Sequence, residues 1–200
     1  MKKNETSEAK FANTVLYLLE RCAPEKPGIQ ALLNMLWFAD LWHYREHLKV
    51  ITGSEYIAMT SGPVVENYKA VFASLASQGV LRYQQVEVYG KPKKKEEYTP
   101  LVEANDDIFD ESELRTLGRV VKECAGESGT ALSRRTHLDG PWLHVWNEQR
   151  PNQPIHRTAF RWLDNLPDDD DCILAQTCVA RMDVQSEIGV MSDSPEDKLQ

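Results

Sequence analysis

Two histidines and an aspartate share one face of the strongest helical segment, at a spacing that could hold a metal ion. Asp40, His43 and His47 follow one another at intervals of three and four residues, so they project from the same side of a helix. Two histidines at this spacing can reach one Zn²⁺ ion, with a carboxylate as a third ligand. Tyr44, however, stands where the zinc-protease motif HExxH has its glutamate. We therefore favour a structural role: Asp40 and His43 form a buried hydrogen-bonded pair, His47 lies at the rim, and no metal or other cofactor binds.

Motifs of other enzyme classes are absent from the sequence. It contains no GxSxG nucleophile elbow and no cysteine in a recognisable nucleophile motif. It also lacks the phosphate-binding patterns GxxxxGK[ST] and GxGxxG. We therefore assign no catalytic residue and expect a protein that is not an enzyme.

The helix that carries Asp40 is predicted over residues 28–48 and has the clearest amphipathic pattern of the chain. Ile29, Leu32, Leu33 and Leu36 recur at the spacing of one helical face. We expect this to be the central helix of the fold. Further helices are expected over residues 7–22, 111–125, 130–137, 141–148 and 158–166, the second of them capped by Asp110 or Ser112.

The middle of the chain combines extended and helical patterns. Residues 49–62 predict one or two short strands or an extended loop. Pro63 suits the first turn of a helix over 63–79, and a β-hairpin over 80–102 follows. The predicted fold class is α+β and mainly helical, with a long central helix, one β-hairpin after a helix and a short extended segment.

A helix followed by a hairpin is also the layout of a winged helix–turn–helix protein. The segment KPKKK at residues 91–95 would then be a wing tip that touches phosphate. The helix before it carries Lys69 as its only base, whereas a recognition helix normally offers several groups that read bases. A DNA-binding regulator therefore remains an alternative, and we do not expect nucleic acid as a partner.

Charge and hydropathy set the expected organisation and location. The net charge is −8; ten acidic and three basic side chains from residue 161 onward account for −7, which leaves −1 for residues 1–160. We expect a globular domain over residues 1–166 and an acidic, flexible tail over 167–200.

No run of about 18 apolar residues occurs, and the polar start does not resemble a signal peptide. A cytoplasmic protein without a membrane partner is expected.

Two blocks of sequence resemble the Panacea domain, a family associated with phages and plasmids whose members include SocA-like antitoxins. The first is LLNMLWFADLWHYREHLKVITGSEYIAMTSGPVVENY and the second is LSRRTHLDGPWLHVW. Together they carry the family's motif positions Leu36, Trp37, Asp40, His43, Gly62, Pro63, Val64, Thr136, His137, Pro141 and Trp142. The resemblance covers residues 10–150 approximately. Trp37 departs from it, because a tyrosine or phenylalanine is usual there.

The resemblance implies a non-enzymatic antitoxin whose partner is a cognate toxin. Direct neutralisation by binding is the expected mechanism, and delivery of the toxin to the ClpXP protease is the first alternative. The motif residues either fix the fold or bind the partner. In the first case Asp40, His43 and His137 would form a buried polar network, and Gly62 and Pro63 would set a tight turn into a helix.

The acidic tail has two interpretations. It is either a solvated extension or a segment that folds onto a basic toxin surface. Its apolar residues Ile173, Leu174, Val179 and Met182 are the candidates for such a contact.

Overall fold

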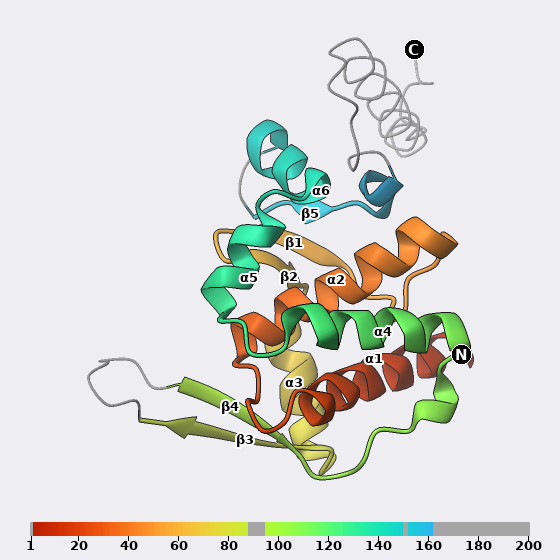
Figure 1. Cartoon of the computed structure of the whole chain (residues 1–200), viewed down its shortest axis with the longest axis vertical. Coiled ribbons are helices and arrows are strands. Elements are labelled where there is room, and N and C mark those ends of the chain that lie inside the picture. The colour runs from red at the N-terminus through yellow and green to blue at the C-terminus, as the bar shows by residue number, and fades with distance from the viewer. Residues whose placement is uncertain (1, 88–94, 150–151, 162–200) are drawn as a thin grey trace, which may run out of the picture.

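The computed structural model describes residues 2–87, 95–149 and 152–161 and contains helices around a central helix together with two small antiparallel sheets (Figure 1). The α-helices are α1 (Lys2–Arg21), α2 (Ile29–His47), α3 (Tyr68–Ser77), α4 (Glu111–Cys124), α5 (Gly129–Thr136) and α6 (Gly140–His144). The strands are β1 (Tyr56–Met59), β2 (Gly62–Val65), β3 (Leu81–Val86), β4 (Lys95–Pro100) and β5 (Pro154–Ile155). Short 3₁₀ or π turns are η1 (Asp106–Ile108), η2 (Val145–Gln149) and η3 (Arg157–Arg161). The predicted mainly helical α+β class is confirmed.

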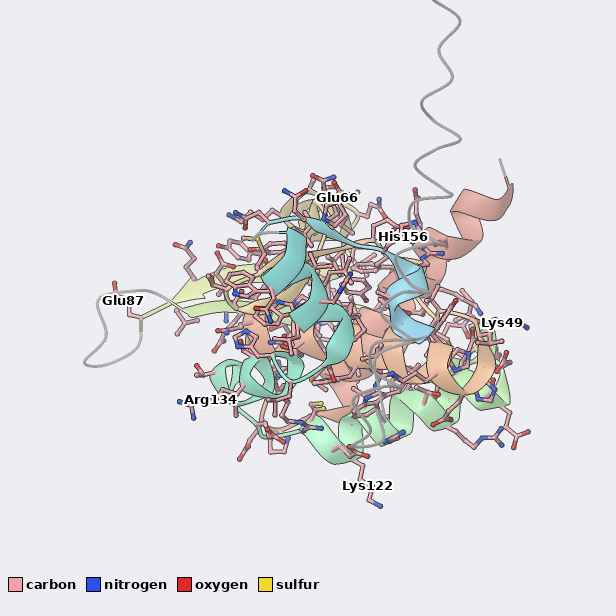
Figure 2. All side chains as sticks on the ribbon, turned by 90° about the horizontal axis from the view of Figure 1, so that it is seen from above. Lys49, Glu66, Glu87, Lys122, Arg134 and His156 are labelled. Atoms are coloured by element: carbon pink, nitrogen blue, oxygen red, sulfur yellow. The ribbon has the colours of Figure 1, made fainter. Side chains whose placement is uncertain are left out.

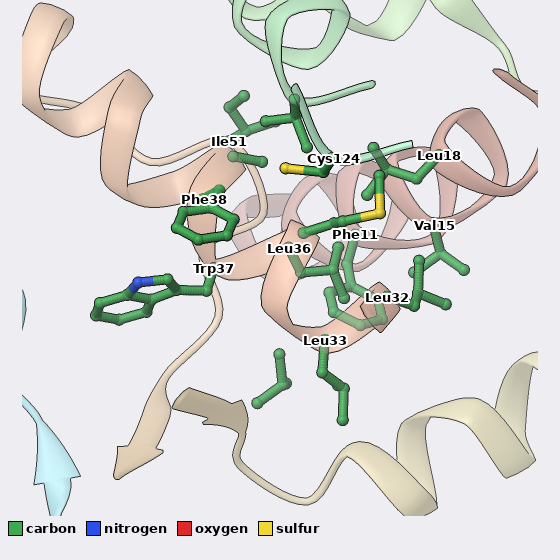
Figure 3. Packing of buried hydrophobic residues seen from close by; sticks show 14 of the residues in the cluster. Phe11, Val15, Leu18, Leu32, Leu33, Leu36, Trp37, Phe38, Ile51 and Cys124 are labelled. Carbon is green, nitrogen blue, oxygen red and sulfur yellow. The ribbon is translucent and has the colours of Figure 1, made fainter. Parts of the chain in front are cut away.

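Helix α2 is the centre of the fold, as predicted. Every residue from Ala31 to His43 is buried, because α1 and α4 cover one side of the helix and β2 and α5 cover the other. Leu32 and Leu36 pack among α1 side chains such as Val15 and Leu18 (Figure 3). A helix with apolar side chains on most of its circumference has to be enclosed in this way.

Asp110 caps helix α4, so the structure selects the first of the two predicted capping residues, Asp110 and Ser112. The Asp110 side chain accepts hydrogen bonds from the backbone N–H groups of Ser112 and Glu113, and the Glu113 carboxylate accepts one from the Asp110 N–H. This capping box satisfies donors that a helix start leaves free. Leu117 and Val120 are buried below it.

Residues 56–65 form a β-hairpin, so the prediction of a helix over 63–79 is wrong at its start. Strand β1 pairs with β2 in the register Ala58↔Pro63 and Met59↔Gly62, and the helix α3 begins only at Tyr68. Two effects favour the strand. Proline is tolerated on an edge strand, and Val64–Val65 are β-branched residues that pack well in a sheet.

A third strand of this sheet was not predicted. Tyr56 and Ile57 pair with Ile155 and Pro154 of β5, between the helices predicted over residues 141–148 and 158–166. The predicted hairpin β3–β4 is confirmed with Tyr83 opposite Tyr98. The predicted last helix corresponds to η3 up to Arg161; the proposed boundary at 166 and the tail over 167–200 lie outside the described residues.

Candidate functional site

The Asp40 carboxylate lies at the centre of a closed set of hydrogen bonds. Oδ1 accepts from the backbone N–H groups of Ile51 (2.7 Å) and Thr52 (2.8 Å). Oδ2 accepts from the hydroxyls of Thr52 and of Tyr56, the latter at 2.8 Å. The carboxylate is fully buried. It therefore fastens the loop after α2 and strand β1 to the central helix.

Burial and hydrogen bonding act in opposite directions on this group. Burial raises the pKa of Asp40, and the hydrogen bonds from Thr52, Tyr56 and Ile51 lower it in part. Burial and the neighbouring Asp40 raise the pKa of Tyr56 well above its ordinary value, so its phenol stays protonated and remains a donor. The arrangement suits a structural anchor that is closed to solvent.

His43 faces a different element from Asp40, so the predicted Asp40–His43 pair is wrong. Its Nδ1 lies 3.1 Å from Thr116 Oγ1 of α4. Thr116 gives its own hydroxyl proton to the Ser112 carbonyl, so the histidine Nδ1–H is the donor. The physical reason is that residues three positions apart on an α-helix differ by about 60° around its axis. His43 therefore points towards α4, while Asp40 points towards residues 51 and 52.

His47 lies beside His43, with ring centroids 4.6 Å apart. Its side chain is about one-third exposed, as expected of a residue at the rim. Within residues 2–87, 95–149 and 152–161, no group of three or more His, Cys, Asp or Glu side chains could hold a metal ion.

Acidification is expected to destabilise the fold through His43. Burial, and then the neighbouring His47, lower the pKa of His43, so the folded state disfavours the protonated ring. The stability tied to the neutral ring is present above the unfolded pKa of about 6.5 and is lost as pH falls towards the folded value. His43→Asn keeps a hydrogen-bond donor near the position of Nδ1 but does not titrate. Between pH 7.5 and 5, urea unfolding should therefore show a smaller decrease in the free energy of unfolding for His43→Asn than for the wild type. An equal decrease in the two proteins would contradict this prediction.

The second motif block surrounds the β1–β2 hairpin. Trp142 donates its indole N–H to the Met59 carbonyl at 3.1 Å. His137 stacks on Trp142 at 4.1 Å between centroids and contacts Ser133. The predicted network of Asp40, His43 and His137 is therefore wrong, because His137 contacts Ser133 and Trp142, whereas Asp40 and His43 have other partners.

The two blocks meet at Gly62. Its φ is +98°, and an added Cβ would lie 2.5 Å from both Asn34 Oδ1 on α2 and Thr136 Oγ1 on α5. The glycine therefore ends the two-residue turn of the β1–β2 hairpin and lets both helices approach. The predicted turn into a helix at this position is wrong, since a strand follows.

Gly62→Ala is expected to lower the free energy of unfolding by about 3 kcal/mol, because it adds a clash to a strained backbone conformation. Gly79→Ala is the matched control: its φ is +73° and nothing lies within 4 Å of the added carbon, so only the strain of about 1 kcal/mol remains. Urea unfolding of both variants measures the difference. Equal losses would show that the close approach at Gly62 does not matter.

A search of protein families finds a match to the family described as antitoxin SocA-like, Panacea domain, over residues 32–143. This is more than half of the chain. The chain belongs to this family. No curated protein matches the chain significantly. No solved structure does so either.

The SocA-like Panacea match includes the first motif block and most of the second, and the structure shows what these residues do. Asp40, Gly62 and Trp142 join elements through buried contacts. Trp37, which stands where a tyrosine or phenylalanine is usual, donates its indole N–H to Asp139 at 3.0 Å. Pro141 is buried in the first turn of α6, and Val64 is half-buried in β2. The Panacea motif thus ties α2, the hairpin and the α5–α6 segment together.

Several partners of the motif residues were missed by sequence reasoning. They are Asn34, Thr52, Tyr56, Thr116 and Asp139. Polar residues such as Asn34 inside an apolar helical run are a usable signal, because buried polar groups need partners. The proposed tail contacts at Ile173, Leu174, Val179 and Met182 lie outside the described residues.

Proposed function

We propose that this chain is an antitoxin that neutralises its cognate toxin by direct protein–protein binding. Membership of the SocA-like family supports an antitoxin role in general. The observation that supports direct binding is that the polar groups of the motif residues Asp40 and Trp142 are hydrogen-bonded to partners inside the fold. These residues therefore stabilise the fold, and the toxin would bind to the surface that the fold presents.

The nucleophiles and acids of the described core support a binding role over catalysis. Burial raises the pKa of the Cys22 thiol, and it raises that of Cys124 to about 12. Thiols in this state are poor nucleophiles. The Asp40 carboxylate is fully buried, and its oxygens accept hydrogen bonds from Ile51 and Thr52. None of the described helices is long and apolar enough to cross a bilayer.

The test is co-expression of this chain with the protein of the adjacent reading frame. Neutralisation by binding predicts that the neighbour stops growth alone, that this chain restores growth, and that the two proteins co-purify at stable levels. Restored growth with loss of the neighbour only when ClpXP is present would replace direct binding by proteolytic delivery. Growth unaffected by the neighbour, together with no complex, would contradict the antitoxin proposal for this pair. Retention on heparin that weakens with salt would instead favour the DNA-binding alternative.

A further inference from the structure

A groove of about 720 Å³ lies between the N-terminal half of α1 and helix α3. The loop at residues 52–55 closes one end of it. Its base is apolar, with Phe11, Val65 and Leu75 buried. The Phe11 ring meets Phe72 of α3 edge to face, with centroids 6.1 Å apart, and this contact supports the base.

The walls of the groove consist of small side chains. Ala9 and Ala12 line it from α1, and Ala70 and Ser74 line it from α3. Ala70 and Ser74 are exposed although they lie beside an apolar base. Small residues let the backbone of a further helix come close, as in helix packing generally. Helix α3 has ten residues, so the wall is roughly 15 Å long, which matches about three helical turns.

The rim of the groove is acidic. Glu8, Glu55 and Glu66 are exposed and line it, and no Lys, Arg or His does so. Arg157 pairs with Glu55 at 3.0 Å. Glu8 and Glu66 have no ion-pair partner among the described residues. The groove therefore presents two free carboxylates beside an apolar base.

The Panacea motif holds the closed end of this groove in place. Asp40 binds the backbone N–H of Thr52, and the Thr52 carbonyl accepts a hydrogen bond from the Ser7 hydroxyl at 3.1 Å. Gly53 permits this approach, because a Cβ there would lie 2.5 Å from Ser7 Oγ. The buried carboxylate thus fixes the start of α1 against the loop at residues 52–55.

We infer that this groove receives a basic amphipathic helix of the toxin, an inference that rests on the proposed antitoxin function. Apolar residues at intervals of three and four fill the base, and Lys or Arg side chains at the flanks meet Glu8 and Glu66. A helix is favoured because it satisfies its own backbone groups, and because both walls of the groove are helices that it can pack against. The acidic C-terminal segment of this chain is disfavoured as occupant, since like charges would face each other.

The test uses the complex with the protein of the adjacent reading frame and two kinds of variant. Ala70→Trp fills the groove, whereas Ala73→Trp places the same side chain on the same helix outside it. We expect Ala70→Trp to weaken binding by about thirtyfold or more, as for a blocked interface centre, and Ala73→Trp to leave the Kd unchanged. Urea midpoints near that of the wild type establish that both variants are folded.

Charge reversal tests the basic character of the partner. Glu8→Arg combined with Glu66→Arg is expected to weaken binding about tenfold at low salt, and the difference should shrink at high salt. Glu103→Arg, an exposed change outside the groove, is the control and should have no such effect.

A photo-crosslinking amino acid provides a readout that does not depend on weakened binding. Placed at Gln78 on the rim it should capture the toxin, and placed at Lys122, which lies across the molecule from Glu66 in Figure 2, it should not. If the wild-type complex forms while Ala70→Trp binds equally well or the crosslink comes from Lys122, the groove assignment is overturned and the antitoxin function stands. If the wild-type chain neither binds nor restores growth, the proposed function fails and the groove inference falls with it.

Discussion

Asp40→Ala is expected to lower the free energy of unfolding by about 4 kcal/mol. The substitution leaves the N–H groups of Ile51 and Thr52 without their acceptor in a fully buried site, whereas the Tyr56 hydroxyl can still donate to the Leu36 carbonyl, 3.0 Å away. Each unpaired buried donor costs about 1–3 kcal/mol, and the terms are not additive because the loop can relax. Domains of this size are stable by only about 5–15 kcal/mol, so a loss of this size would remove from about a quarter to about four-fifths of that stability.

Asp40→Asn is the matched control for this prediction. Its amide keeps the volume and one acceptor for the two backbone N–H groups, but it turns an NH₂ towards the hydroxyls of Thr52 and Tyr56. We expect a loss of about 2 kcal/mol, since hydroxyls can rotate and accept. Urea unfolding followed by circular dichroism measures both variants. A loss below about 1 kcal/mol for Asp40→Ala would contradict the view that these donors depend on the carboxylate.

Trp37→Ala is expected to cost about 4 kcal/mol, as for other buried tryptophans. The indole is fully buried and packs edge to face on Tyr56 and Phe160, with centroids 5.1 and 4.9 Å away. It also donates to Asp139 Oδ2. Its removal therefore opens a cavity between α2, β1 and η3 and takes a donor from a carboxyl group whose pKa burial already raises.

Trp37→Phe separates packing from hydrogen bonding. The phenyl ring keeps part of the apolar contact but loses the bond to Asp139 and the volume of the second ring, so we expect a loss of about 2 kcal/mol. Both variants are measured by urea unfolding, with the fluorescence of the remaining tryptophans as a second probe. Equal losses for alanine and phenylalanine would show that the hydrogen bond, and not the ring packing, is what stabilises this junction.

The sequence was sufficient where local pattern decides the structure. The apolar spacing from Ile29 to Leu36 predicted α2, and the acidic residue before an amphipathic run predicted the cap at Asp110. The sequence was insufficient where the secondary structure of a segment depends on contacts with a distant part of the chain. Strand β5 has two residues, and only its pairing with β1, about a hundred positions earlier, makes it a strand.

In the candidate site, too, some features could be predicted from local sequence and others depend on distant segments. Burial of Asp40 and His43 could be inferred from their place on an apolar helix, and both are buried. Their partners could not be inferred, because these depend on the path of the chain after α2. Leu48 adopts a left-handed conformation with φ 57° and turns the chain so that residues 51 and 52 face Asp40.

The pairing of β5 with β1 has a consequence for the order in which the newly made chain acquires its structure. Residues 154–160 supply the outer strand on Tyr56, the Arg157 contact to the Gly53 carbonyl and the Phe160 ring on Trp37. All of them are translated after the segment that carries the family match, which ends at residue 143. While they are still inside the ribosome, β1 is an open edge and Trp37 lacks part of its cover, a state prone to wrong pairing. A fragment cut at the end of the family match would remain in that state permanently, so the folding unit is longer than the motif blocks that identify the family.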